Sequence, residues 1–314
     1  MTFDLRSPYD SVEPRQNWNL AVNDVPDRAA IDLQGPVKFQ FARTASVASA
    51  GSCFANRLAT YLAASGLHYP VYEPGAEPLS ARHGNVYTTL QLRQLLERAL
   101  GIFTPAELAW PTPHGRWLDP FRPLVDRAGF STIPEMERAR RVHLAAVRRM
   151  FEETDVFIFT MGLTEVWCDA RDGAAFPTPP GRGRGIFDPK RHTFRNLDVA
   201  ANAAELDAFV GRLNAINPTA RVILTVSPVP IALTMEPTHV ARASLYSKAV
   251  LKVVAEEAAR RHHNVDYFAS YDAIAHNFGD RPAYEEDARH LQPWVAERAV
   301  ELFVKRYFEA QLKP

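Results

Sequence analysis

A glycine, a hydroxyl and a thiol follow one another at Gly51, Ser52 and Cys53, directly before an amphipathic run of the sequence. Ser52 and Cys53 are both candidate nucleophiles, because a side chain at a helix N-terminus meets free backbone N–H groups and the positive end of the helix dipole. These groups favour a developing anion and the reactive form of a thiol. The structural alternative is a serine N-cap followed by a small buried cysteine.

A second candidate group lies near the other end of the chain, where Asp287 precedes His290 by three residues in "YEEDARH". In a loop or single turn this spacing lets the carboxylate hold one imidazole nitrogen while the other takes a proton from a nucleophile. A charged helix start with a surface histidine is the alternative. If the two ends of the chain meet, the sequence predicts a Ser/Cys-His-Asp site.

The elements that must position these residues alternate between strands and helices. Strands are predicted at 45–51, 68–72, 155–161, 221–226 and 265–269, and the third and fourth are nearly continuous apolar runs, as in strands buried on both faces. This pattern predicts an α/β protein, a three-layer α/β/α sandwich with a mostly parallel, roughly five-stranded sheet. We expect the site at the carboxyl ends of its strands.

Helices are predicted between these strands from apolar residues that recur at helical spacing. They are the run that carries Phe54, Leu58 and Leu62, a run from Glu135 to Phe151, the run 238–262, and a last run that carries Val295, Ala299, Phe303 and Tyr307. The Asp287 and His290 pair stands just ahead of the last of these helices.

Two segments, near 101–133 and 171–196, interrupt this pattern with prolines and glycines. We interpret them as irregular insertions in a single domain that spans 1–314, with its core at about 40–310. The second insertion carries a group of five cations between 182 and 195, and it is either a mobile lid that meets an anionic or sugar-like substrate or a solvated surface loop. These cations are Arg182, Arg184, Lys190, Arg191 and Arg195.

Composition narrows the classes of function. Basic and acidic residues are equal in number, 36 of each, so no global field would draw the chain to nucleic acid or to an anionic membrane. The two cysteines, Cys53 and Cys168, do not form a disulfide framework, and the first residues read as neither signal peptide nor membrane anchor. We therefore expect a cytoplasmic protein that acts on a small molecule or carbohydrate, with no cofactor and no metal; the sequence does not predict an oligomeric state.

Seven sequence blocks together resemble the GSCFA domain family, which is grouped with the SGNH (GDSL-like) hydrolases. They appear in the family's order over most of the chain. The blocks are "GSCFA" (51–55), "GNVYTTLQL" (84–92), "FTMGLTEVW" (159–167), "LTVSPVP" (224–230), "YSK" (246–248), "YFASYD" (267–272) and "YEEDARH" (284–290).

The resemblance implies an SGNH-type, flavodoxin-like sheet and assigns roles to residues. The first block supplies the nucleophile and a backbone N–H of the oxyanion hole, and Gly84 supplies a second donor. An alignment without a gap places Cys53 at the position of the superfamily's serine, whereas a shift by one residue restores Ser52, and both stay candidates.

The third block departs from the superfamily pattern G-x-N-D, since Gly162 to Glu165 places Thr164 at the position of the asparagine donor. A threonine hydroxyl is a shorter donor, and Asn85 is an alternative third donor. Glu165 is expected to pack and to position the end of the strand. Ser227, Tyr246 and Lys248 are expected to shape the rim of the pocket.

The implied activity is hydrolysis or transfer of O-acyl groups, with acetyl esters of a carbohydrate or cell-surface glycan precursor as the expected substrate. The alternative is a non-catalytic carbohydrate- or ligand-binding module that kept the cleft. The Asp287 and His290 pair favours the enzyme, since a binding cleft does not need it.

Overall fold

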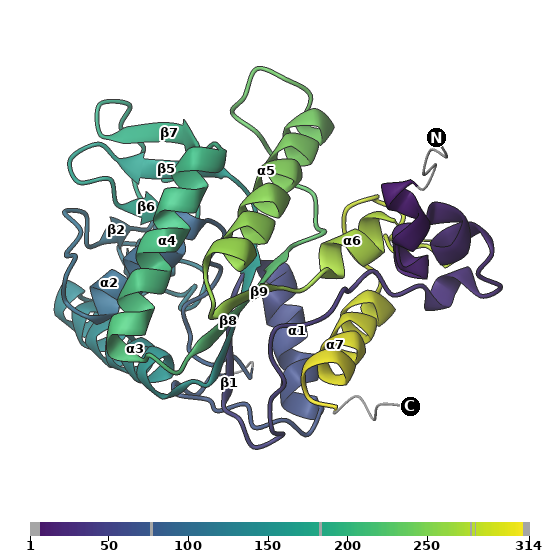
Figure 1. Cartoon of the computed structure of the whole chain (residues 1–314). Coiled ribbons are helices and arrows are strands. Elements are labelled where there is room, and N and C mark those ends of the chain that lie inside the picture. Colours follow the sequence, from purple (N-terminus) through teal and green to yellow (C-terminus); the bar gives the residue numbers. More distant parts are fainter. Residues whose placement is uncertain (1–6, 76–77, 182–183, 277, 280, 310–314) are drawn as a thin grey trace, which may run out of the picture.

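A parallel sheet of four strands, in the order β1-β4-β8-β9, lies at the centre of the molecule (Figure 1). The computed structural model describes residues 7–75, 78–181, 184–276, 278–279 and 281–309. The strands are β1 (Val47–Gly51), β4 (Val156–Met161), β8 (Arg221–Val226) and β9 (Val265–Tyr267), which confirms four of the five predicted strands and the mixed α/β class. Gly51 pairs with Thr160, and Met161 with Val226, so three strands end side by side at one edge.

The prediction of a strand at 68–72 is wrong. This segment makes isolated backbone bonds to different parts of the chain: among them, the carbonyl of His68 accepts the N–H of Val47 at 2.9 Å, and the N–H of Tyr72 donates to Ser80 at 2.8 Å. Pro70 has no N–H to give to a ladder, which explains why the apolar and aromatic residues around it do not extend the sheet. The parallel sheet in the described part of the chain therefore has four strands.

Helices cover both faces of this sheet, because successive side chains of a strand point to opposite sides. Phe157 and Phe159 of β4 belong to a core cluster shared with α2 to α5, whereas Val156 and Ile158 belong to a second cluster shared with α1 and α7. The helices are α1 (Cys53–Ala64), α2 (Thr89–Ala99), α3 (Ile133–Glu153), α4 (Val199–Ile216), α5 (Val240–Arg261), α6 (Ser270–Ala275) and α7 (Pro293–Tyr307). Within the described residues, none of them is both long and apolar enough to cross a bilayer.

Local sequence signals fix where the helices next to the site begin. Thr88 and Gln91 form a capping box at the start of α2, in which each side chain bonds the backbone N–H of the other residue. Pro293 opens α7 at a position where the missing N–H costs nothing. The chain that reaches α7 therefore enters from a loop, and this loop carries Asp287 and His290.

Both segments expected to be irregular contain short strands. The segment 101–133 holds the hairpin of β2 (Trp110–Pro111) and β3 (Trp117–Leu118). The segment 171–196 holds β6 (Ala175–Phe176) and β7 (His192–Asn196), which flank β5 (Glu165–Asp169) in an antiparallel sheet. Because β5 follows β4 after three residues, this second sheet stands beside the carboxyl edge of the parallel sheet and supplies a wall there.

Candidate functional site

A pocket of about 440 Å³ opens at the carboxyl edge of the parallel sheet. Ser52 and Cys53 follow β1, Gly162 follows β4 and Ser227 follows β8, and all four line it. This is the edge at which open parallel sheets bind ligands. Five predicted site residues thus meet in one pocket, the fifth being Glu165 at the start of β5.

The turn from β1 into α1 separates the roles of the two candidate nucleophiles. Gly51 has φ of 151°, and a Cβ there would clash with the carbonyl of Thr160, so the sharp exit from the strand requires glycine. Ser52 is buried, and its Oγ accepts the N–H of Phe54 at 3.3 Å as the N-cap. Cys53 is a free, exposed cysteine at the first position of α1, and its backbone N–H has no hydrogen-bond partner among the described residues. The thiol, rather than the hydroxyl, is accessible.

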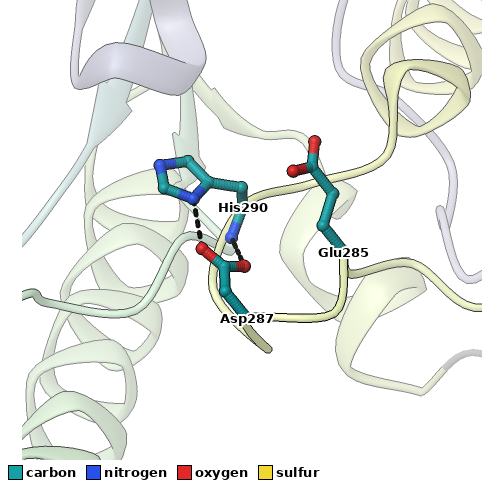
Figure 2. A group of neighbouring side chains, drawn as sticks. All are labelled: Glu285, Asp287 and His290. Carbon is teal, nitrogen blue, oxygen red and sulfur yellow. Dashed lines mark hydrogen bonds and ion pairs between the residues drawn. The ribbon is translucent and has the colours of Figure 1, made fainter.

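The predicted pair of Asp287 and His290 forms in the loop before α7 (Figure 2). Asp287 bonds the Nδ1 of His290 with one carboxylate oxygen, and with the other it accepts the backbone N–H of His290 at 2.9 Å. This backbone N–H, followed by the imidazole and the N–H of Arg289, lowers the pKa of Asp287 to about 2. The ionised carboxylate therefore orients the ring with Nδ1 as donor, which leaves Nε2 as the acceptor.

Arg289, rather than His290, reaches the pocket from this loop. Its guanidinium lies 3.3 Å from Nε2 of His290, and it lines the pocket together with Ser52 and Cys53. Its Nε is buried without a hydrogen-bond partner. No hydrogen bond joins His290 to Ser52 or Cys53 in the described part of the chain. The loop therefore reaches the pocket through Arg289, whereas the next residue, His290, does not line it.

The predicted oxyanion donors are dispersed. Gly84, with φ of 70°, and Asn85 line a separate pocket of about 360 Å³. Thr164 is fully buried and donates its hydroxyl to Asn196 at 2.6 Å, so it does not face the main pocket. Gly162 lines the pocket, but its N–H is taken by the carbonyl of Tyr87 at 2.8 Å.

Tyr87 is a pocket residue that the sequence analysis did not single out. Its hydroxyl accepts the side-chain amide of Asn85 at 2.8 Å, which leaves the phenolic proton free to donate. Burial, reinforced by the thiol of Cys53, raises the pKa of Tyr87 to about 12. The phenol therefore stays protonated close to Cys53, and Asn85 acts on the site through it. The block "GNVYTTLQL" contains Tyr87, but only the fold shows that it faces the pocket.

Glu165 and Ser227 use their polar atoms to shape the pocket wall. The carboxylate of Glu165 accepts the hydroxyl of Thr234 at 2.6 Å and the backbone N–H of Met235 at 3.1 Å, which holds the loop 231–236 over the pocket. Ser227 is buried, and its Oγ accepts the N–H of Val229 at 3.3 Å. The positioning roles expected for both residues stay predictions.

Lys248 is buried behind the site, whereas Tyr246 is exposed, and neither lines the pocket. Lys248 donates to the carbonyl of Gly162, and no carboxylate pairs with it in the described residues. Burial lowers the pKa of Lys248 to about 7; the thiol of Cys53 opposes this shift and Arg289 adds to it. The helical spacing from the buried Ser244 to Lys248 and Leu251 could have indicated that this lysine points inward.

One group in the described residues has the composition of a metal site. Glu285, Asp287 and His290 each offer a ligand atom within 4.8 Å of the others. All three are exposed, and the carboxylate of Asp287 already bonds the imidazole (Figure 2). Exposed acidic groups of this kind are common without an ion, so the geometry adds no second reason for a metal.

The cations of the 171–196 segment lie away from the pocket as far as they are described. Arg191 pairs with the buried Glu107, which also contacts His192 at 3.2 Å. Arg184, Lys190 and Arg195 are also absent from the pocket lining, and Arg182 lies outside the described residues.

Comparison with known proteins gives a family but no activity. The GSCFA family model matches residues 46–307, from the start of β1 to the end of α7. No curated protein and no solved structure is significantly similar to the chain. Since the matched region covers most of the 314 residues, the chain belongs to the GSCFA family.

Proposed function

We propose that this protein is an SGNH-type hydrolase or acyltransferase that acts on O-acyl esters, with Cys53 as its nucleophile. The observation that carries the proposal is the exposed thiol of Cys53 at the N-terminus of α1, inside the main pocket, while Ser52 is buried and caps the helix. The helical cover on both faces of the parallel sheet supports the α/β/α sandwich of the SGNH hydrolases. In this assignment the gap-free alignment is the correct one.

The proposed reaction begins when the thiolate of Cys53 attacks the ester carbonyl carbon. The carbonyl electrons move to oxygen, and the free N–H of Cys53 and the hydroxyl of Tyr87 stabilise the oxyanion. The C–O bond then breaks, and the leaving alkoxide takes the proton that His290 received from the thiol. A thioester on Cys53 remains.

The second half-reaction releases the acyl group. Water or an acceptor hydroxyl attacks the thioester carbon, and Nε2 of His290 takes its proton. The C–S bond breaks to give the acid or the new ester and restores the thiolate of Cys53. Asp287 keeps the imidazole in the tautomer that both halves need. Both half-reactions require the 284–291 loop to move so that His290 passes Arg289 and reaches the sulfur of Cys53. Such a movement is compatible with catalysis because catalytic contacts often form only in the substrate complex.

A non-catalytic binding module is the second candidate. The observation in its favour is the separation of the Asp287 and His290 pair from the pocket lining, together with the burial of Thr164 away from it. In that case the pocket binds a ligand and the His-Asp pair is a loop-stabilising contact.

Hydrolysis of p-nitrophenyl esters by matched variants tests the proposal. Cys53→Ala should lower turnover by about a thousandfold or more, because the nucleophile is lost. Ser52→Ala should retain turnover and lower the free energy of unfolding by about 1 kcal/mol, as the loss of an N-cap does. Cys168→Ala, at the other free cysteine, is the control.

Two outcomes would contradict the assignment. Full loss of turnover in Ser52→Ala with a folded protein, and retained turnover in Cys53→Ala, would make Ser52 the nucleophile. No turnover in the wild type with any ester, combined with slow alkylation of Cys53 by iodoacetamide, would leave the binding module.

A further inference from the structure

The walls of the main pocket differ from its floor. Ser52, Cys53 and Gly162 form a polar floor at the strand ends, whereas β5, β6 and β7 and the loop after β8 contribute aromatic and aliphatic side chains. The apolar members of the lining include Leu163, Val166, Trp167, Phe176, Phe194 and Ile231. A ligand that reaches the thiol therefore has its far end among hydrocarbon groups.

Two of the polar side chains that line the pocket, Gln91 and Glu165, already have hydrogen-bond partners within the protein. Gln91 accepts the N–H groups of Tyr87 and Thr88 and donates to the carbonyl of Phe176. Glu165 accepts two hydrogen bonds from the loop above it. The hydroxyls of a sugar ring in this space would lose water and would gain no partner from Gln91 or Glu165. An apolar chain has no such cost.

The volume also exceeds what an acetyl group needs. At about 30 Å³ for a water-sized group, the three heavy atoms of an acetyl group occupy about 90 Å³, and the nine of an octanoyl group about 270 Å³. The pocket has about 440 Å³. It therefore holds a chain of medium length and still leaves room for the reacting ester.

The mouth of the pocket is also lined by apolar side chains. Leu233 and Met235 line it with 64% and 59% of their surface exposed, on the loop that Glu165 holds in place. Arg289 lies at the nucleophile end with its buried Nε unpartnered, where a carboxylate would be the natural partner. One end of the pocket thus suits a hydrocarbon chain and the other a carboxyl carbon.

We infer that the main pocket binds a medium-chain acyl group, with its chain against Trp167, Phe176 and Phe194 and its carboxyl carbon at Cys53 and Arg289. This inference rests on the proposed function for the reaction, but not for the binding. It replaces the acetyl group expected from the sequence with an acyl chain of about eight carbons, on the volume scale above.

Binding of free fatty acids to the folded Cys53→Ala variant tests the inference without turnover. Acetate, butyrate, hexanoate and octanoate are titrated by calorimetry, with N-acetylglucosamine as the sugar probe. Burial of each methylene contributes about 0.8 kcal/mol, so the affinity should rise about fourfold per CH₂ through octanoate. Equal affinity for acetate and octanoate, or preferential binding of the sugar, would overturn the inference.

Substitutions then locate the chain. Leu163→Trp narrows the pocket, and octanoate should lose its advantage over butyrate. Leu245→Trp, on an exposed leucine of α5 outside the pocket lining, is the matched control and should bind octanoate as before. If Leu163→Trp fails to fold, Leu233→Ser at the exposed mouth provides the second variant and should weaken octanoate severalfold; unchanged binding in both would refute the placement.

The same chain lengths as p-nitrophenyl esters separate the inference from the proposed function. A kcat/KM that rises from acetate to octanoate supports both. If fatty acid binding depends on chain length but the wild type hydrolyses no ester, the acyl-binding inference holds and the proposed esterase activity is rejected. If the acetate ester is hydrolysed rapidly and kcat/KM does not rise with longer chains, the proposed esterase activity holds and the medium-chain acyl pocket is rejected.

Discussion

Two histidine–carboxylate pairs in this molecule have the same bond and opposite surroundings. His143 contacts Glu73 through Nδ1 at 2.6 Å, with only 1% of its side chain exposed. His290 contacts Asp287 through the same atom, but their side chains are 53% and 47% exposed. One pair lies inside the protein near α3 and the other on the loop beside the pocket.

Burial fixes the charge state of the first pair. It lowers the pKa of His143 to about 4, with Arg122 acting in the same direction and Glu73 against it. Burial would raise the pKa of Glu73, but the hydrogen bond from His143 and the charge of Arg122 outweigh it and lower this pKa to about 2. At neutral pH the pair is therefore a neutral imidazole on a carboxylate that also binds Arg122 at 3.1 Å.

The contrast shows that the environment of a His-carboxylate pair, and not the pair itself, decides its use. A buried imidazole cannot exchange protons with a substrate, whereas the exposed Nε2 of His290 can. We therefore expect the first pair to contribute to stability, and the proposed function gives the second a role in chemistry. Each assignment can be tested against the other.

The largest expected effect is on turnover. His290→Ala should lower kcat for the best p-nitrophenyl ester by about a hundred- to ten-thousandfold, the usual contribution of a positioned general base. The urea midpoint should not change. His263→Ala, at an exposed histidine outside the pocket, is the control. Wild-type kcat in His290→Ala would remove this pair from the mechanism.

Next in size is the effect of breaking the buried pair. Glu73→Gln should lower the free energy of unfolding by about 3 kcal/mol, because the buried Arg122 loses the carboxylate at 3.1 Å and keeps only that of Asp119, at 3.6 Å. Urea denaturation followed by circular dichroism measures this. Glu286→Gln, at an exposed glutamate, is the control, and an equal midpoint in both variants would show that the buried cluster does not contribute.

The stability of the protein should depend on pH through the buried His143. Because the pKa of His143 is lower in the folded chain than its ordinary value of 6.5, the unfolded chain binds more protons below pH 6.5, so stability falls as the pH falls. Between pH 6 and pH 4.5 this contributes about 2 kcal/mol. His143→Gln should remove that part of the slope. Parallel stability curves for wild type and His143→Gln would contradict the lowered pKa.

The smallest expected effect is the change in protein stability when the exposed pair of Asp287 and His290 is broken. Asp287→Asn should leave the urea midpoint where it is in the wild type, because water solvates both partners in the folded and unfolded chain. A midpoint shift as large as that of Glu73→Gln would mean that the loop, and not only the buried cluster, holds the fold together.

Much of the fold could be predicted from local patterns. The apolar runs of β4 and β8 indicated buried strands, and their observed bounds differ from the predicted ones by at most one residue. The segment 68–72 has similar residues but contains Pro70 and makes a single backbone bond to β1, from Val47 to His68, so the same kind of pattern failed there. The antiparallel sheet of β5, β6 and β7 was missed because its short strands lie in proline- and glycine-rich sequence.

The candidate site also combines features that local sequence patterns predicted with features that depend on tertiary packing. The bond between Asp287 and His290 and the cap formed by Ser52 join residues within three positions, so their spacing in the sequence was sufficient. The burial of Thr164 against Asn196 and the entry of Arg289 into the pocket depend on how distant segments pack. No local pattern contains that information.

The sequence by itself therefore determined the parallel strands, the turn at Gly51 and the partner of His290, since each depends on backbone conformation and short-range bonds. Only the tertiary structure decided that Cys53 is exposed while Ser52 is buried, that Tyr87 lines the same pocket, and that hydrocarbon side chains of the second sheet form the far wall. The reason is physical: exposure and the neighbours of a side chain are set by contacts between residues far apart in the chain.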